Sequence, residues 1–210
     1  MKNVRVFFSK KGQLRFVSHL DMNRFFTRVL RKSGLPIWYT EGFNPHPYLT
    51  FALPLSLGFE SEYEILDFRL LDDDFPLESI AEKLTAVLPP YIEIKRVAEP
   101  LMKSGKINAA GFDLCFENPC IADEFFGFLN EGNVVISKKT KKGDIKVQEV
   151  SEKIISADKT ENKVSLVLPA GNDNLNPSLL VASFNEKKGT NISVSYTRTA
   201  VYAQDNQLFV

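Results

Sequence analysis

Residues 15–54 read RFVSHLDMNRFFTRVLRKSGLPIWYTEGFNPHPYLTFALP, and this stretch decides how the first half of the chain folds. Its first part has the pattern of a capped helix. Ser18 can accept a backbone N–H of the first turn, and Asp21 lies near the positive helix end. Gly34, with a proline two residues later, ends the pattern. The stretch therefore predicts a helix over about residues 19–33.

Two different sides run along this helix at about 100° per residue. One side is mostly apolar: Met22, Phe25, Phe26, Val29 and Ser33. The opposite side holds Arg24, Arg28 and Arg31, with Asp21 beside them. A solvated face of an amphipathic helix explains this pattern, and so does a phosphate-binding stripe, because the guanidinium fork pairs with two oxygens. We therefore name these three arginines, with Arg15, as candidate anion- or RNA-binding residues.

The second part of the stretch is a loop, Asn44-Pro-His-Pro47, that its prolines make stiff. Proline fixes its own φ angle and pushes the preceding residue, here Asn44 and His46, toward extended geometry. Gly42 indicates an unusual backbone angle just before it. The loop is either a stiff connector between helix and strand or a preorganised site.

Both histidines of the chain, His19 and His46, lie in this stretch. If residues 36–40 form the strand after the helix, the following loop folds back toward the helix N-terminus. We then expect one polar pocket that contains six residues: Ser18, His19, Asp21, Glu41, Asn44 and His46. Histidine titrates near neutrality, so His19 and His46 are the catalytic candidates, although a helix-capping or packing role explains His19 equally well.

The element order predicts two similar halves. In the first half we expect strands at 3–9 and 13–17, a helix at 19–33, strands at 36–40, 49–55 and 62–71, a helix at 76–88 and a strand at 91–97. In the second half we expect a strand at 108–116, a helix at 122–130, strand-like pieces within 134–150, a strand at 163–168, a helix at 177–187 and a strand at 191–202. The sequence thus predicts an α+β fold with antiparallel sheets and helices on one face. It would consist of two ferredoxin-like (split β-α-β) halves, residues 1–98 and 108–210, joined by a linker at 99–107.

Charge is unevenly spread, although the net charge of the 210 residues is zero. Residues 1–32 hold nine Lys or Arg against one acid, and residues 60–82 hold nine acids against one base. The two segments either neutralise each other as packed neighbours, or present a basic face to nucleic acid and an acidic face to a protein. Residues 138–146, KKTKKGDIK, form a loop whose lysines are either solvated or bind phosphate: Lys138, Lys139, Lys141 and Lys142.

Several classes of site find no support. No apolar run reaches the roughly 18 residues that a membrane span needs, and residues 1–13 lack a signal-peptide core, so we expect a cytoplasmic protein that does not bind membranes. Phosphate-loop, dinucleotide-binding, zinc-protease and iron–sulfur motifs are absent from the sequence. Cys115 and Cys120 have a poor spacing for a metal. We expect neither metal nor cofactor, and enzymatic activity stays open, with a non-catalytic role favoured.

Four motifs carry a family resemblance: RFVSHLD, R-x3-R, EGFNPHP and PLSLG-x2-S-x-Y-E. They resemble a bacterial family of radical SAM-associated proteins of unknown function, specifically over about residues 1–70 and more loosely to the C-terminus. Members of that family stand beside a B12-binding-type radical SAM protein or are fused to one, so the resemblance implies a separate radical SAM partner. It implies no catalytic residues. The residues that match are Arg15, Ser18, His19, Asp21, Arg24, Glu41, Gly42, Asn44, Pro45, His46 and Pro47.

The sequence thus favours an accessory RNA-binding or substrate-presenting module that works with a radical SAM enzyme in RNA modification or processing. One alternative is a metal-independent endoribonuclease that uses His19 and His46, since CRISPR repeat-processing nucleases also pair ferredoxin-like halves. The other is a protein-binding adaptor that uses the acidic segment 60–82. The aromatic signature of RRM domains is absent.

Overall fold

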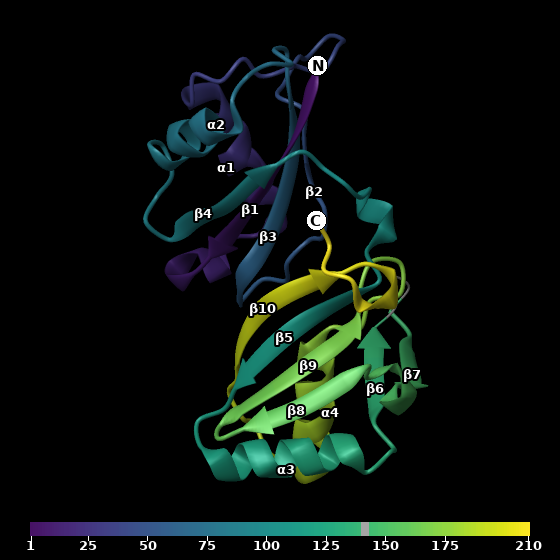
Figure 1. Ribbon diagram of the computed structural model, residues 1–210. Coiled ribbons are helices and arrows are strands. Elements are labelled where there is room, and N and C mark those ends of the chain that lie inside the picture. The colour runs from purple at the N-terminus through teal and green to yellow at the C-terminus, as the bar shows by residue number, and fades with distance from the viewer. Residues whose placement is uncertain (140–142) are drawn as a thin grey trace. The chain divides into compact units, whose positions relative to one another are not determined.

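The computed structural model describes residues 1–139 and 143–210 (Figure 1). It is a mixed α+β protein, as the sequence predicts, and the strand pairings among the described residues are antiparallel. The chain divides into two compact units. The first contains Met1–Lys106 and Val210, and the second contains Ile107–Phe209. None of the described helices combines the length and the apolarity that crossing a membrane requires.

The first unit is built around a central strand, β1. Its elements are β1 (Lys2–Lys10), the 3-10 helix η1 (Gly12–Phe16), α1 (His19–Lys32), β2 (Leu49–Phe51), β3 (Phe59–Leu70), α2 (Leu77–Thr85), β4 (Ile92–Ala98) and the 3-10 helix η2 (Ser104–Lys106). β1 pairs with β4 on one side and with β3 on the other, and β2 pairs with the far side of β3. The strand order is therefore β4-β1-β3-β2, and β1 and β2 run in the same direction.

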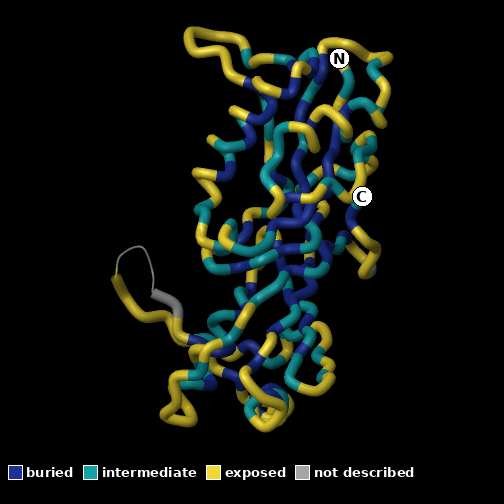
Figure 2. The backbone as a smooth tube through the Cα atoms, turned by 90° about the vertical axis from the view of Figure 1, so that its left-hand side faces the viewer, coloured by how far each residue is buried: buried dark blue, intermediate teal, exposed yellow. Residues whose placement is uncertain are grey.

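Alternation along the strands places the core on one face of this sheet. Every second residue of β1 from Val4 to Phe8 is buried against the helices, and the alternate residues Asn3, Arg5 and Phe7 belong to the other face. Phe26 of α1 packs on Phe8 with ring centroids 4.9 Å apart. Residues of α2 join the same cluster, so both helices cover the same face. Figure 2 shows the buried segments in dark blue and the outermost turns of the chain mostly exposed.

Two predicted strands of the first half are wrong. Most of residues 13–17 forms η1, where the N–H of Val17 bonds to the carbonyl of Leu14 as in a tight turn. Residues 36–40 form only isolated bridges. Pro36 has no N–H to donate to a ladder. The strand that follows α1 is β2, which lies after the Asn-Pro-His-Pro loop and not before it.

The second unit has the strand order β10-β5-β9-β8, with β6 and β7 forming a separate hairpin. Its elements are β5 (Ala109–Cys115), α3 (Pro119–Asn130), β6 (Val135–Lys139), β7 (Ile145–Glu149), the 3-10 helix η3 (Ser151–Lys153), β8 (Ser156–Thr160), β9 (Lys163–Pro169), α4 (Pro177–Lys188), β10 (Ser195–Tyr202) and the 3-10 helix η4 (Gln204–Asn206). Phe125 and Phe128 of α3 contact Phe184 of α4, each with ring centroids 5.6 Å apart. β8, a polar strand at the end of the sheet, was not predicted from the sequence.

Candidate nucleic-acid interface

α1 begins where the sequence predicts, with Ser18 as its cap. The Ser18 hydroxyl accepts the backbone N–H of Asp21 at 3.1 Å and donates to the Asp21 carboxylate at 2.7 Å. This hydrogen bond holds the pKa of the Asp21 carboxyl below its ordinary value, and the positive charges of Arg24 and Arg28 lower that pKa further. The predicted cap is therefore confirmed, and it fixes the start of the helix that carries the arginines.

Replacing Ser18 with alanine is expected to raise the pKa of Asp21. The serine hydrogen bond is the largest single cause of the lowered pKa, and Arg24→Gln is expected to raise the pKa as well, because it removes both a hydrogen bond and a positive charge. Because the folded-state pKa is the lower one, ionised Asp21 stabilises the fold above its unfolded pKa, and this stabilisation disappears as pH falls through the folded pKa. NMR titration of the Asp21 carboxyl carbon measures both variants. An unchanged pKa in Ser18→Ala would contradict the assigned cause.

Three arginines form an exposed stripe on α1. Arg24, Arg28 and Arg31 are all exposed, on the side of the helix away from the buried residues. Arg24 pairs with Asp21 at 3.2 Å, one helical turn earlier. Arg28 and Arg31 form no salt bridge with any acid in the described part of the chain. Two positive charges therefore face solvent without a direct salt bridge, although the charge of Arg28 is close enough to Asp21 to lower its pKa.

By contrast, two cations in or just after β1 form salt bridges with acids of β3. The guanidinium of Arg5 donates two hydrogen bonds to the Asp67 carboxylate, each 2.7 Å long. Lys11, just after β1, pairs with Glu62 at 2.7 Å. The two oppositely charged segments of the sequence are thus packed as neighbours in part. Among the cations of residues 1–32, Arg15 in η1 and Arg28, Arg31 and Lys32 in α1 form no salt bridge with an acid in the described part of the chain.

His19 and Arg15 lie close to the start of α1. The His19 ring packs edge-on against Phe51 of β2 with centroids 5.2 Å apart, and its Nε2 lies 3.1 Å from the Asn23 amide nitrogen. The guanidinium of Arg15, in η1, lies over the ring of Phe16 at 4.8 Å. The Phe16 side chain is 64% exposed. An arginine and an exposed aromatic ring therefore stand together just before the helix.

The Asn-Pro-His-Pro loop is the tip of a short hairpin. Tyr39 bridges to Pro47, and Thr40 donates its N–H to the carbonyl of His46 at 2.9 Å. The His46 Nδ1 lies 3.0 Å from the carbonyl oxygen of Asn44. A carbonyl only accepts, so Nδ1 is the donor in this contact. Gly42 has φ of 122°, the unusual angle that the sequence predicts.

The shared pocket of His19 and His46 was expected because the Asn-Pro-His-Pro loop would fold back toward the start of α1. The structure does not support this arrangement. Leu49 and Val4 both stand opposite Phe68, so β2 begins level with the start of β1. The hairpin precedes β2, whereas α1 follows the other end of β1. The two histidines therefore lie toward opposite ends of the strands, and the endoribonuclease alternative loses its geometric basis. The six expected pocket residues form two groups: Ser18, His19 and Asp21 at the helix, and Glu41, Asn44 and His46 at the hairpin.

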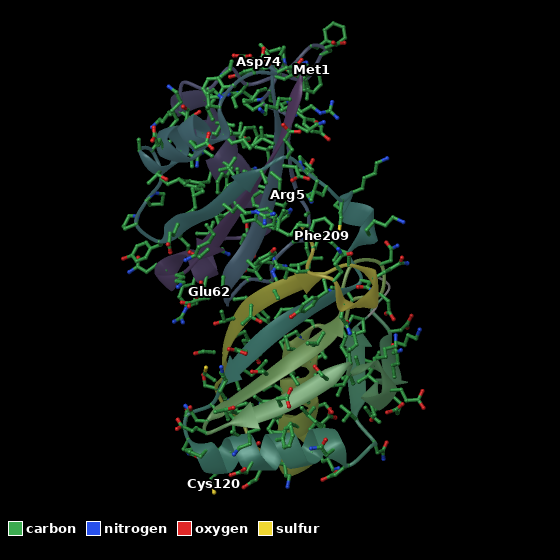
Figure 3. The ribbon with its side chains drawn as sticks, viewed as in Figure 1. Met1, Arg5, Glu62, Asp74, Cys120 and Phe209 are labelled. Atoms are coloured by element: carbon green, nitrogen blue, oxygen red, sulfur yellow. The ribbon has the colours of Figure 1, made fainter. Side chains whose placement is uncertain are left out.

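The remaining candidates add little to this interface. Lys141 and Lys142 lie outside the described residues, and so do the side chains of Lys138 and Lys139 in β6. Cys115 and Cys120 are free, exposed cysteines, and Figure 3 labels Cys120 at α3. Within residues 1–139 and 143–210, no group of three or more His, Cys, Asp or Glu could hold a metal ion.

The first unit also has a polar groove that was not predicted from the sequence. Asp67 and Arg69 alternate with buried residues of β3, as Asn3 and Arg5 do on β1, and all four line a groove of about 540 Å³ on the sheet face opposite the helices. The alternation of polar and apolar residues in β3 was the available signal. This alternation indicates that one face of β3 is polar, but it does not indicate which other strands and segments line a groove with that face.

A family model described as "Uncharacterized protein conserved in bacteria (DUF2344)" matches residues 3–181. No curated protein matches the sequence.

Proposed function

This chain belongs to the bacterial family DUF2344, and we propose that it is an accessory RNA-binding module that works with a separate radical SAM enzyme in RNA modification or processing. The observation that carries the proposal is the exposed stripe on α1. Arg28 and Arg31 form no salt bridge among the described residues, while Arg5 of β1 and Lys11, just after β1, are each paired with an acid of β3. Uncompensated arginines in a row on a rigid helix favour binding to a polyanion.

Single-stranded RNA is the polyanion that the surroundings of the stripe favour. The stripe from Arg24 to Arg31 is about 10 Å long at 1.5 Å per residue, which is long enough to contact more than one phosphate. Exposed aromatic rings supply stacking surfaces for unpaired bases. Phe16 stands beside Arg15, and Phe43 at the hairpin tip is fully exposed. These rings and the arginines are parts of one unit.

The partner in this proposal comes from the family resemblance of the motifs in residues 15–64. Proteins of that kind stand beside, or are fused to, a radical SAM protein. In the proposal the partner performs the radical chemistry, and this chain supplies binding and orientation of the RNA. The exposed acids Asp72, Asp73 and Asp74, which follow β3, offer a surface of opposite charge for a protein contact.

We also propose that each unit is a ferredoxin-like half. The strand orders β4-β1-β3-β2 and β10-β5-β9-β8 support this assignment, because both place the first and third strands of the unit in the middle. In each unit one helix follows the first strand and another precedes the last. The β6–β7 hairpin is then an insertion between α3 and β8.

Affinity purification from cells tests the function. We expect the wild-type chain to retain RNA and a radical SAM protein, and the triple variant Arg24→Gln, Arg28→Gln, Arg31→Gln to lose most of the RNA while it keeps the protein. The matched control removes three exposed lysines elsewhere, Lys95, Lys106 and Lys188, by the same change to glutamine. Equal RNA retention by the triple variant would contradict the proposal, and a wild-type chain that retains protein without RNA would favour an adaptor.

A further inference from the structure

The polar groove of the first unit lies on the face of the sheet that α1 and α2 do not cover. Arg5 and Asn3 come from β1, Asp67 and Arg69 from β3, and Thr50 from β2. Figure 3 labels Arg5 on β1. The segment from Pro100 to Ser104 completes the lining. A volume of about 540 Å³ lies within the range typical of small-molecule sites, roughly 300–1,000 Å³.

The Arg69 side chain is fixed in this groove, and only one of its guanidinium nitrogens donates a hydrogen bond within the described residues. Its Nε donates to the side-chain oxygen of Asn3 at 3.0 Å. The central guanidinium carbon lies 4.6 Å from the centroid of the Tyr48 ring and 5.4 Å from that of Trp38. Within the described chain, no acceptor pairs with its two terminal nitrogens. A guanidinium fixed at one edge and packed against two rings has lost much of its freedom, so its remaining donors are preorganised for an oxyanion.

The charge of the groove favours the same kind of ligand. Three cations line it, Arg5, Arg69 and Lys103, against one acid, Asp67. Both oxygens of Asp67 already accept from Arg5, which is only 1% exposed. That pair fixes the floor of the groove, and the balance of charge at its rim is positive.

We propose that this groove binds a phosphate-bearing small molecule of nucleotide size. The phosphate binds to the terminal nitrogens of Arg69, and the organic part lies against Tyr48 and Met102, which also line the groove. Inorganic phosphate alone fills only a small part of about 540 Å³. The site does not depend on the RNA-binding role, because the arginine stripe belongs to a helix on the opposite face of the sheet.

Isothermal titration calorimetry tests the inference with the four ribonucleoside 5′-monophosphates, inorganic phosphate and adenosine as probes. We expect at least one mononucleotide to bind the wild-type chain and the control variant Lys188→Gln, at the end of α4 in the second unit, with the same affinity. Arg69→Gln is expected to weaken that binding about tenfold or more, and Arg69→Lys to weaken it as well, since lysine lacks the fork. Adenosine, without phosphate, is expected to bind at least about tenfold more weakly than AMP if AMP is the ligand.

Three results would overturn the inference. The first is that no mononucleotide binds the folded wild-type chain at millimolar concentration. The second is that folded Arg69→Gln binds as tightly as the wild type, with folding checked by circular dichroism. The third is that inorganic phosphate binds as tightly as every nucleotide, which would mean that the groove does not contact an organic part. None of these results bears on the arginine stripe, so the RNA-binding proposal stands or falls separately.

Discussion

Replacing Phe26 with alanine is expected to lower the free energy of unfolding of the first unit by about 3–5 kcal/mol. Phe26 is completely buried, and its ring packs against Phe8 at 4.9 Å and against Phe51 at 5.7 Å between centroids. The substitution removes buried apolar area and leaves a cavity among rings that α1 and two strands supply, so both costs add. Urea unfolding followed by the fluorescence of Trp38, the only tryptophan, reports on this unit.

Phe25 provides the matched control on the same helix. Its ring contacts Phe26 at 5.2 Å, but the side chain is only partly buried at the edge of the core. Phe25→Ala is therefore expected to cost less than half as much as Phe26→Ala. Equal losses for the two variants would mean that the core does not have the boundary described here, and a loss below about 1 kcal/mol for Phe26→Ala would remove α1 from the core.

Replacing Asp67 with alanine is expected to lower the free energy of unfolding by about 3 kcal/mol, the lower end of the range for breaking a buried ion pair. Arg5 is 1% exposed, and without Asp67 its Nε and one terminal nitrogen lose their acceptors. The Asp67 side chain is 24% exposed, so water relieves part of the penalty. The same urea titration with Trp38 fluorescence measures the loss.

A double variant distinguishes the net contribution of the Arg5–Asp67 ion pair to stability from the cost of leaving Arg5 charged without its partner. Arg5→Met with Asp67→Leu removes both charges and keeps apolar volume, and we expect it to be more stable than Asp67→Ala alone. Asp67→Asn keeps one acceptor and is expected to fall between the wild type and the alanine variant. A loss under about 1 kcal/mol in Asp67→Ala would show that Arg5 is well solvated without its partner.

The parts of the fold that the sequence predicted well are those that local signals specify. Ser18 caps α1 through a residue three positions away, and Gly34 follows the helix end with φ of 68°. The arginine stripe follows from helical spacing alone. Helical spacing does not show which cations form salt bridges. The partner of Arg5, Asp67, lies 62 residues away in the sequence, and only the pairing of β1 with β3 brings the two together.

The errors have equally specific causes. Residues Ile37 to Tyr39 are apolar and aromatic, which favours a strand, but the flanking prolines restrict them to a narrow hairpin with single bridges. The segment SADKT of β8 has too few apolar residues to be noticed as a strand, and it pairs because it lies beside β9. The setting of Arg69 needs three segments together: β1, β3 and the hairpin. The hairpin, β8 and the surroundings of Arg69 all depend on tertiary contacts, which a single sequence does not reveal.

The salt dependence of RNA affinity shows whether the arginines of α1 bind phosphate. For single-stranded RNA, each phosphate contact contributes about 0.7 to the slope of log K against log salt concentration. Fluorescence anisotropy with a labelled oligonucleotide, from about 50 to 200 mM salt, gives this slope for each variant. If Arg24, Arg28 and Arg31 bind phosphates, their replacement by glutamine makes the slope shallower by about 2 and weakens binding, while the Lys95, Lys106 and Lys188 control keeps the wild-type slope. An unchanged slope and affinity in the folded triple variant would contradict the account.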